Sequence, residues 1–242
     1  MLSKLITLFI LSATVSISTA EEMPTRIGHA YDKETNELLY TETHFEKFSG
    51  VTVAKSKVVY KDTSEEVFAE KNVDFSVNKF LPEFKLKNKV TGHIEGTRFV
   101  ESKYEVTFVE SETKPKKEVA IDIPSDGISD SGYDNFIIKH WEEIKEGEVF
   151  VRGFLIPSLT KFIKFRIYQD KVIDDEQGLL RVINVEPNSF LLRAFAGTSV
   201  LYYDKAKPRL RKYDGVSNLR DDKGENLQVT IRYEDTNNIA LN

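Results

Sequence analysis

Residues 38–60 read LLYTETHFEKFSGVTVAKSKVVY, and this stretch decides the fold class. Apolar and aromatic side chains alternate with polar ones on both sides of Ser49-Gly50, a pattern typical of half-buried β-strands. Gly50 supplies the positive φ that a tight hairpin turn needs. The stretch therefore predicts two antiparallel strands joined by a short turn.

The same two-residue alternation continues along the chain, with Gly, Asn, Asp and Pro clusters between the segments. The pattern predicts strands at residues 38–48, 51–60, 67–75, 85–93, 98–109, 119–123, 149–156, 162–168, 179–185, 199–203, 209–213 and 227–233. A parallel sheet would need a helix after nearly every strand, and such helices are missing. We therefore expect a mainly β protein, built as a curved antiparallel sheet or half-barrel.

One segment has clear helical spacing, from Gly132 to Glu146. Its apolar residues recur three and four positions apart and form one stripe: Tyr133, Phe136, Ile137, His140, Trp141 and Ile144. We expect this helix to pack on the concave face of the sheet. A second candidate helix, Ser189 to Ala196, is equally compatible with a strand.

The first twenty residues have the layout of a secretory signal peptide. Lys4 precedes the apolar run Leu5 to Leu11, and small residues lead to Ala20. The apolar run is shorter than the roughly 20 residues that a membrane-spanning helix needs, so no stable transmembrane anchor is expected. We predict cleavage after Ala20, a single β-rich domain over residues 21–234, and a flexible tail over residues 235–242.

Composition narrows the compartment and the class of partner. The chain contains no cysteine, which excludes disulfides and a lipid-modified N-terminal cysteine. An exported domain without disulfides is more typical of a bacterial periplasm than of eukaryotic secretion, so we expect a periplasmic location. The net charge of −5 gives no general attraction for phosphate backbones, and no nucleic-acid partner is expected.

The sequence lacks the common catalytic and cofactor motifs: no phosphate-binding glycine loop, no dinucleotide fingerprint, no G-x-S-x-G and no H-E-x-x-H. We therefore expect no cofactor, no metal and no assigned catalytic residue. Glu42, His44 and Glu46 share one strand face, for which a solvated polar face is the favoured interpretation over a metal site. These three residues, or His140 with Asp134, remain the acid–base candidates of a remote enzyme alternative.

Two charged patterns have mainly structural interpretations. The carboxylates of Asp122, Asp126, Asp130 and Asp134 are spaced by four, unlike a calcium-binding loop, and predict a connecting loop. The alternating residues Lys205, Lys207, Arg209 and Arg211 form a basic stripe that is a candidate site for an anionic partner. Pro208 favours a protected edge strand for the same stretch.

Aromatic residues are abundant and many occupy alternating strand positions. We expect the following side chains near any apolar cavity: Phe136, Ile137, Trp141, Phe150, Phe154, Phe162 and Phe165. A curved sheet with a large apolar concave face either fills itself or holds a hydrophobic ligand. The sequence predicts non-enzymatic binding of a lipid or acyl ligand, with an envelope structural or protein-interaction module as the alternative.

Three segments together resemble uncharacterised, signal-peptide-bearing periplasmic proteins of Gram-negative bacteria: residues 39–44 (LYTETH), 130–136 (DSGYDNF) and 213–219 (YDGVSNL), the last before a final Val-x-Ile-x-Tyr strand. The order of strands, one helix and further strands is also similar to the half-barrel of the lipoprotein carriers LolA and LolB. Those carriers hold acyl chains between a curved sheet and a helical lid. The resemblance implies a periplasmic half-barrel and carries no activity, because fold does not imply function.

Overall fold

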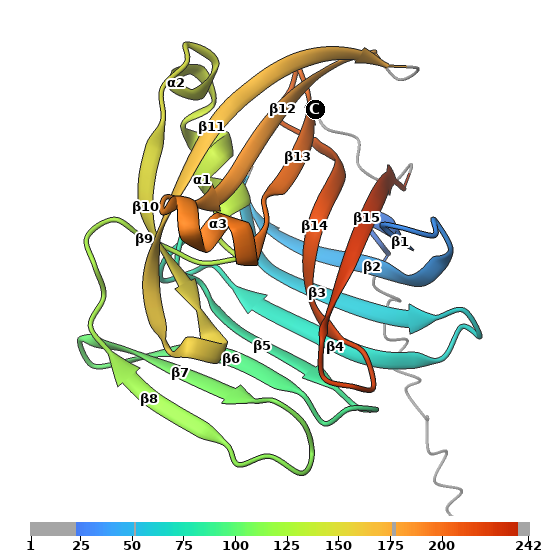
Figure 1. Cartoon of the computed structure of the whole chain (residues 1–242), viewed down its shortest axis with the longest axis vertical. Coiled ribbons are helices and arrows are strands. Elements are labelled where there is room, and N and C mark those ends of the chain that lie inside the picture. The colour runs from blue at the N-terminus through green and yellow to red at the C-terminus, as the bar shows by residue number, and fades with distance from the viewer. Residues whose placement is uncertain (1–22, 51, 176–177, 237–242) are drawn as a thin grey trace, which may run out of the picture.

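The computed structural model describes residues 23–50, 52–175 and 178–236, and its strands form one continuous sheet (Figure 1). The first half of the chain forms β1 (Arg26–Asp32), β2 (Leu38–Ser49), β3 (Thr52–Asp62), β4 (Val67–Asp74), β5 (Glu83–Asn88), β6 (Ile94–Val100), β7 (Lys103–Val109) and β8 (Lys117–Ile121). The second half forms β9 (Gly127–Ile128), β10 (Phe150–Ile156), β11 (Lys161–Asp175), β12 (Gly178–Pro187), β13 (Ser199–Asp204), β14 (Leu210–Arg220) and β15 (Asn226–Asp235). The helical elements are α1 (Tyr133–Lys139), α2 (Trp141–Lys145), the 3-10 turn η1 (Pro157–Leu159) and α3 (Phe190–Ala196).

The sheet consists of two meanders joined through the first and last strands. Its strand order is β8-β7-β6-β5-β4-β3-β2-β1-β15-β14-β13-β12-β11-β10-β9. Every pairing is antiparallel except that of β9 with β10. β1 and β15 lie side by side in the middle, so residues from both ends of the chain become neighbours (Figure 1).

The sheet curves until its two end regions meet. Leu155 of β10 packs in one cluster with Tyr104 and Val106 of β7. Beside this cluster, Lys117 Nζ donates to the carbonyl oxygen of Ser158 at 3.5 Å. The contact is made by side chains rather than by a strand ladder, which leaves an open barrel. The predicted curved antiparallel sheet is thereby confirmed.

The predicted helix at 132–146 packs on the concave face but is interrupted. His140 has φ −102° and ψ 27°, which separates α1 from α2. Phe136, Ile137, Trp141 and Ile144 are buried in the largest apolar cluster, together with inward-facing residues of β10 to β14. The break preserves the direction of the apolar stripe, and periodicity alone therefore did not reveal it.

Several boundaries differ from the prediction. Residues 98–109 form parts of two strands, because the chain turns at Glu101, whose φ is 54°. The segment 85–93 ends as a strand at Asn88, whose side chain accepts hydrogen bonds from the next turn. β1 was missed entirely. Residues 1–22 and 237–242 lie outside the described residues, and so do the predicted signal peptide and most of the predicted tail, although Asp235 belongs to β15.

The second candidate segment, left open between helix and strand, is the helix α3, and the apolar side chains described in its first turn are largely uncovered. Phe190, Leu191 and Leu192 are 76%, 70% and 42% exposed. The helix is held from its other side, where Arg193 donates to Glu186 of β12 at 3.2 Å. No helix in the described part of the chain is long and apolar enough to cross a membrane.

Candidate functional site

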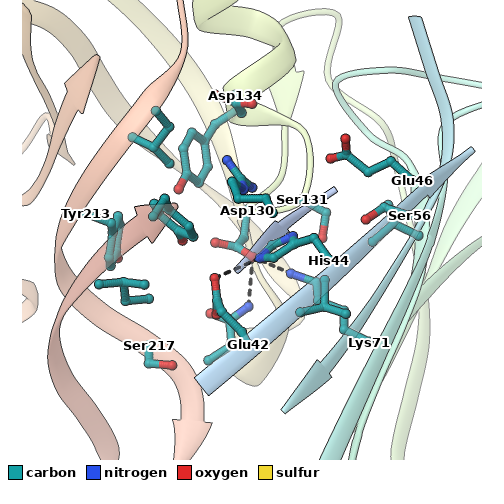
Figure 2. A pocket seen from close by; sticks show the side chains of 18 of the residues that line it. Glu42, His44, Glu46, Ser56, Lys71, Asp130, Ser131, Asp134, Tyr213 and Ser217 are labelled. Atoms are coloured by element: carbon teal, nitrogen blue, oxygen red, sulfur yellow. Dashed lines mark hydrogen bonds and ion pairs between the residues drawn. The ribbon is translucent and has the colours of Figure 1, made fainter. Parts of the chain in front are cut away.

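A polar pocket of about 200 Å³ opens inside the barrel, where the two meanders join (Figure 2). Strands β1 to β4 supply one wall, β14 and β15 supply another, and the chain leading into α1 closes a third side. Its lining combines charged side chains of both signs with tyrosines and with apolar side chains. A pocket in which a few polar groups converge among apolar side chains is the usual form of a ligand-binding site in proteins.

Strand alternation directs Glu42, His44 and Glu46 of β2 into this pocket. Glu42 and His44 are only 5% and 9% exposed, so the expected solvated polar face is wrong. The alternation was correct, but this face points into the barrel. Gly28 on β1 makes room for Glu42, since a Cβ there would lie 2.7 Å from Glu42 Cγ and 2.9 Å from Tyr233 Cε1.

Glu42 and His44 form a buried hydrogen-bonded pair, with 2.9 Å between His44 Nε2 and Glu42 Oε1. Burial alone would raise the pKa of Glu42, but His44, the Tyr233 hydroxyl and Arg26 stabilise the carboxylate and bring its pKa below the ordinary value. Glu42 is therefore ionised at neutral pH. An ionised carboxylate only accepts hydrogen bonds, so His44 donates from Nε2.

The second ring nitrogen of His44 is left with a lone pair. Burial and the nearby charge of Arg26 lower the pKa of His44, and the imidazole is neutral at neutral pH. With Nε2 protonated, Nδ1 is the acceptor. No residue in the described part of the chain donates to Nδ1, and the ring lines the pocket.

Arg26 contributes an uncommitted guanidinium on the same side. Its guanidinium carbon lies 4.3 Å from the centre of the Tyr233 ring, a cation–π stack. Burial alone would lower the pKa of Arg26, but Tyr233 and the carboxylates of Asp134, Glu46 and Glu42 raise it. Within the described residues, none of these groups accepts a hydrogen bond from the guanidinium. Its N–H fork is therefore available to a ligand.

Other polar groups around the pocket are already committed. Lys71 Nζ and Asn218 Nδ2 both donate to Asp130 Oδ2, at 2.8 Å and 2.9 Å. These two bonds tie β4 and β14 to the chain that enters α1. Tyr203 donates to Asp134 Oδ1 at 2.5 Å. Ser131 differs, because its Oγ is buried and has no hydrogen-bond partner in the described structure.

The structure separates the four spaced aspartates. Asp130 and Asp134 line the pocket, whereas Asp126 pairs with Lys164 and Asp122 with Lys103 at the surface. Within the described residues, no three His, Asp or Glu side chains are arranged to hold a metal ion.

The alternative acid–base pair is also divided. His140, at the break between α1 and α2, has its Nδ1 3.4 Å from Oε1 of Glu143 in α2, whereas Asp134 faces the pocket. By contrast, Glu42, His44 and Glu46 stay together in the polar pocket.

The seven residues predicted near an apolar cavity lie in packed clusters. Phe162 belongs to the cluster at the seam, and the other six belong to the cluster under α1 and α2. Ring centres are 5.4 Å apart for Phe136 and Phe150, and 4.8 Å apart for Phe154 and Phe165. None of the seven lines the polar pocket. Their role in ligand binding stays a prediction.

Pro208 predicted an edge strand for the basic stripe, and this prediction is wrong. Strands β13 and β14 lie inside the sheet, and residues 205–209 form the turn between them. Arg209 and Arg211 pair with Asp235, while Lys205 and Lys207 are exposed. Binding of an anionic partner at this turn stays a prediction.

Sequence reasoning missed Arg26, Tyr233 and Ser131 as site residues. The signal for Tyr233 was present in the final alternating strand, where it follows Val229 and Ile231 on one face. Arg26 was missed because β1 itself was missed. The pocket depends on the pairing of β1 with β15, which joins Arg26 to Asp235 and Asp32 to Val229 from opposite ends of the chain, and local patterns do not reveal it.

Comparison with known proteins supports the fold alone. No protein-family model matches the chain, and no match was found among curated proteins. Among solved structures, the chain is similar to a β-barrel-like protein of the domain of unknown function DUF1849 from Brucella abortus. The TM-score is 0.52 at 8% sequence identity, over 88% of this chain and 98% of that one. The likeness agrees with the curved sheet and says nothing about the pocket.

Proposed function

We propose that the protein is an exported, barrel-like protein that binds a small polar molecule in the pocket around Arg26, Glu42 and His44. The proposal rests on one observation above all. The guanidinium of Arg26, partly enclosed in the barrel, has no hydrogen-bond acceptor in the described structure. A guanidinium carries five N–H donors and no acceptor, so a fork that faces a pocket without a protein acceptor is available to a ligand.

Within the described residues, two further groups in the same pocket also lack partners: the Nδ1 acceptor of His44 and the buried Oγ of Ser131. Leaving a buried polar group unpaired costs about 1–3 kcal/mol. Of the three groups the Ser131 Oγ is the fully buried one, and leaving it unpaired is costly for a purely structural interior. A bound molecule that pairs with them offsets this cost.

The size and lining of the pocket favour a small hydrophilic ligand. Its volume of about 200 Å³ lies below the roughly 300–1,000 Å³ typical of drug-sized ligands. Charged side chains and hydroxyls converge on it from strands of both meanders. A single acyl chain would leave these groups without partners, whereas a compact polar molecule satisfies them.

The proposal is tested by thermal unfolding and calorimetric titration with a panel of amino acids, sugars, sugar acids, amines, small carboxylates and fatty acids. We expect at least one polar compound to raise the melting temperature and to bind saturably. The variant Arg26→Met should abolish that binding. Arg232→Met is the matched control, because Arg232 stacks on Tyr31 at 4.7 Å on the outer face of the same strands.

Binding of the polar panel that survives in Arg26→Met would contradict the proposal. Saturable binding of a long-chain fatty acid with no polar binder would instead support the predicted hydrophobic ligand. The proposed export is tested separately, by fractionating cells that express the full chain and determining the N-terminus of the mature protein. A chain that retains residues 1–20 in the cytoplasm would contradict it.

A further inference from the structure

The charges around the pocket are unequal. Two cationic side chains, Arg26 and Lys71, face four carboxylates. His44 adds no charge at neutral pH, because its lowered pKa keeps the ring neutral. The lining is therefore net negative. The carboxylates are Glu42, Glu46, Asp130 and Asp134.

Two of these carboxylates are already satisfied. Glu42 accepts from His44 and Tyr233, and Asp130 accepts from Lys71 and Asn218. These hydrogen bonds hold both carboxylates in place, and they form part of the fixed framework of the site.

Two carboxylates retain free acceptor capacity. Asp134 accepts one bond, from Tyr203 to Oδ1, and Oδ2 has no partner in the described structure. Glu46 has neither a hydrogen bond nor an ion pair within the described residues, although it lines the pocket (Figure 2). The free fork of Arg26 lies close enough to both for their charges to raise its pKa. The pocket thus offers acceptors and a cationic donor to one molecule.

His44 provides independent evidence that these groups bind a ligand. The residue is among the buried polar ones, with 9% exposure, and its ring lines the pocket, yet within the described residues nothing donates to Nδ1. A ligand hydrogen-bond donor fits this acceptor. An ammonium group can donate to Nδ1 and to a carboxylate at the same time, because the ammonium group carries three donors and a positive charge.

We infer that the ligand is dipolar: an ammonium group is held by Glu46, Asp134 and His44 Nδ1, and a carboxylate or similar acceptor is held by Arg26. The inference rests on the proposed polar binding site and deepens it by naming the class, compact amino acids and related amines that bear an acidic group. A simple dianion is disfavoured because the lining is net negative.

Three matched series of probes test the class. Each contains linear acids of two to six carbons that differ only at the far end: ω-amino acids, ω-hydroxy acids and dicarboxylic acids. We expect the tightest binder to be an ω-amino acid, favoured over the hydroxy acid of equal length by about tenfold or more, because a bond to a charged partner is stronger than a neutral one. Calorimetric titration near pH 7 measures the ratio.

Variants of this chain locate the ammonium group. Glu46→Gln should reduce the affinity for the ω-amino acid by about tenfold and should leave that for the hydroxy acid within about twofold. Glu37→Gln, an exposed residue just before β2, is the control and should change neither. Unfolding curves of the variants confirm that each is folded.

Hydroxy or dicarboxylic acids that bind as tightly as the amino acids would overturn the dipolar assignment and leave the polar site intact. The assignment also fails when Glu46→Gln leaves the preference unchanged, or when no ω-amino acid binds although other polar compounds do. Absence of every polar binder would instead refute the proposed function.

Discussion

At the scale of single residues, the barrel interior contains a network of ionisable side chains, and burying them among apolar residues costs free energy. Ionised Glu42 and neutral His44 stabilise each other through one hydrogen bond from His44 Nε2 to the Glu42 carboxylate. Arg26 and Tyr233 lie close by and stabilise the carboxylate further. Such paired groups in a cavity are functional candidates on physical grounds. Their protonation states also make stability depend on pH.

Acidification below about pH 6.5 should destabilise the wild-type protein more than His44→Gln. The folded pKa of His44 lies below its ordinary value of 6.5 because burial and Arg26 disfavour the charged ring. The unfolded chain therefore binds the proton first, and the stabilising contribution, complete above pH 6.5, is lost as the pH falls toward the folded pKa. Urea unfolding at several pH values between about 5 and 8 measures the slope.

His29→Gln serves as the control for that measurement, because His29 alternates to the outer face of β1. Equal pH slopes for the wild type and His44→Gln would mean that His44 does not remain neutral in the folded state.

Gly28→Ala should reduce the free energy of ligand binding by more than it reduces the free energy of unfolding. The added methyl carbon would lie 2.7 Å from Glu42 Cγ and 2.9 Å from a Tyr233 ring carbon, so both side chains must move. Overpacking of this kind costs about 1–3 kcal/mol. Gly153→Ala on β10 is the control, since its nearest neighbour would be a Pro124 side-chain carbon at 3.2 Å. Unchanged binding in Gly28→Ala would show that Glu42 and Tyr233 need not hold their positions.

At the scale of elements, the position of α1 is fixed by the close packing of the chain that leads into it rather than by a capping side chain. Gly132 precedes the helix with no side-chain cap, and a Cβ there would lie 2.0 Å from the carbonyl oxygen of Phe80. The close approach lets Asp130, Ser131 and Asp134 reach the pocket from the segment that leads into and begins α1. The apolar side of α1 then anchors the arrangement.

Gly132→Ala should therefore lower the free energy of unfolding by about 1–3 kcal/mol or more, because the obstacle is backbone and cannot rotate away. Chemical denaturation measures the loss. Leu191→Ser on α3 is the contrasting change, and it should alter stability by less than about 0.5 kcal/mol since Leu191 is 70% exposed. A stable Gly132→Ala protein would show that the chain can enter α1 by another path.

Elements whose signals are local were predictable from the sequence, and those set by distant pairing were not. The alternation in residues 38–60 predicted β2 and β3 because adjacent residues carry the whole pattern. The same alternation placed Glu42 and His44 on one face. Whether that face points inward depends on β1, β14 and β15, which lie beside it only after the chain ends meet. The helical spacing of the apolar residues continues across His140, so it did not reveal the break between α1 and α2.

At the scale of the whole molecule, the pocket belongs to both meanders. Arg26, Glu42 and His44 come from the first, and Asn218 and Tyr233 come from the second. The β1–β15 ladder joins the halves at the pocket, with Gly28 opposite Tyr233. On the other side, side chains at the seam hold the open barrel together. The site therefore depends on the curvature of the complete sheet.

Leu155→Ala at the seam should cost about 2–5 kcal/mol, because a side chain that is 1% exposed leaves a cavity between β10 and β7. Leu159→Ala is the control, because Leu159 lies in η1 directly after β10 and is 50% exposed, and it should cost far less. Thermal and urea unfolding compare the two. Equal losses would show that the seam packing does not support the barrel.

The measurement that tests the central claim most directly is a two-dimensional amide and side-chain NMR titration of the mature protein with its tightest polar ligand. We predict saturable shifts at the Arg26 guanidinium, at His44 and at Ser131, with no shift at the outward-facing Arg232. Saturable shifts confined to residues outside the pocket, or the absence of any saturable shift across the polar panel, would contradict a ligand-binding role for this pocket.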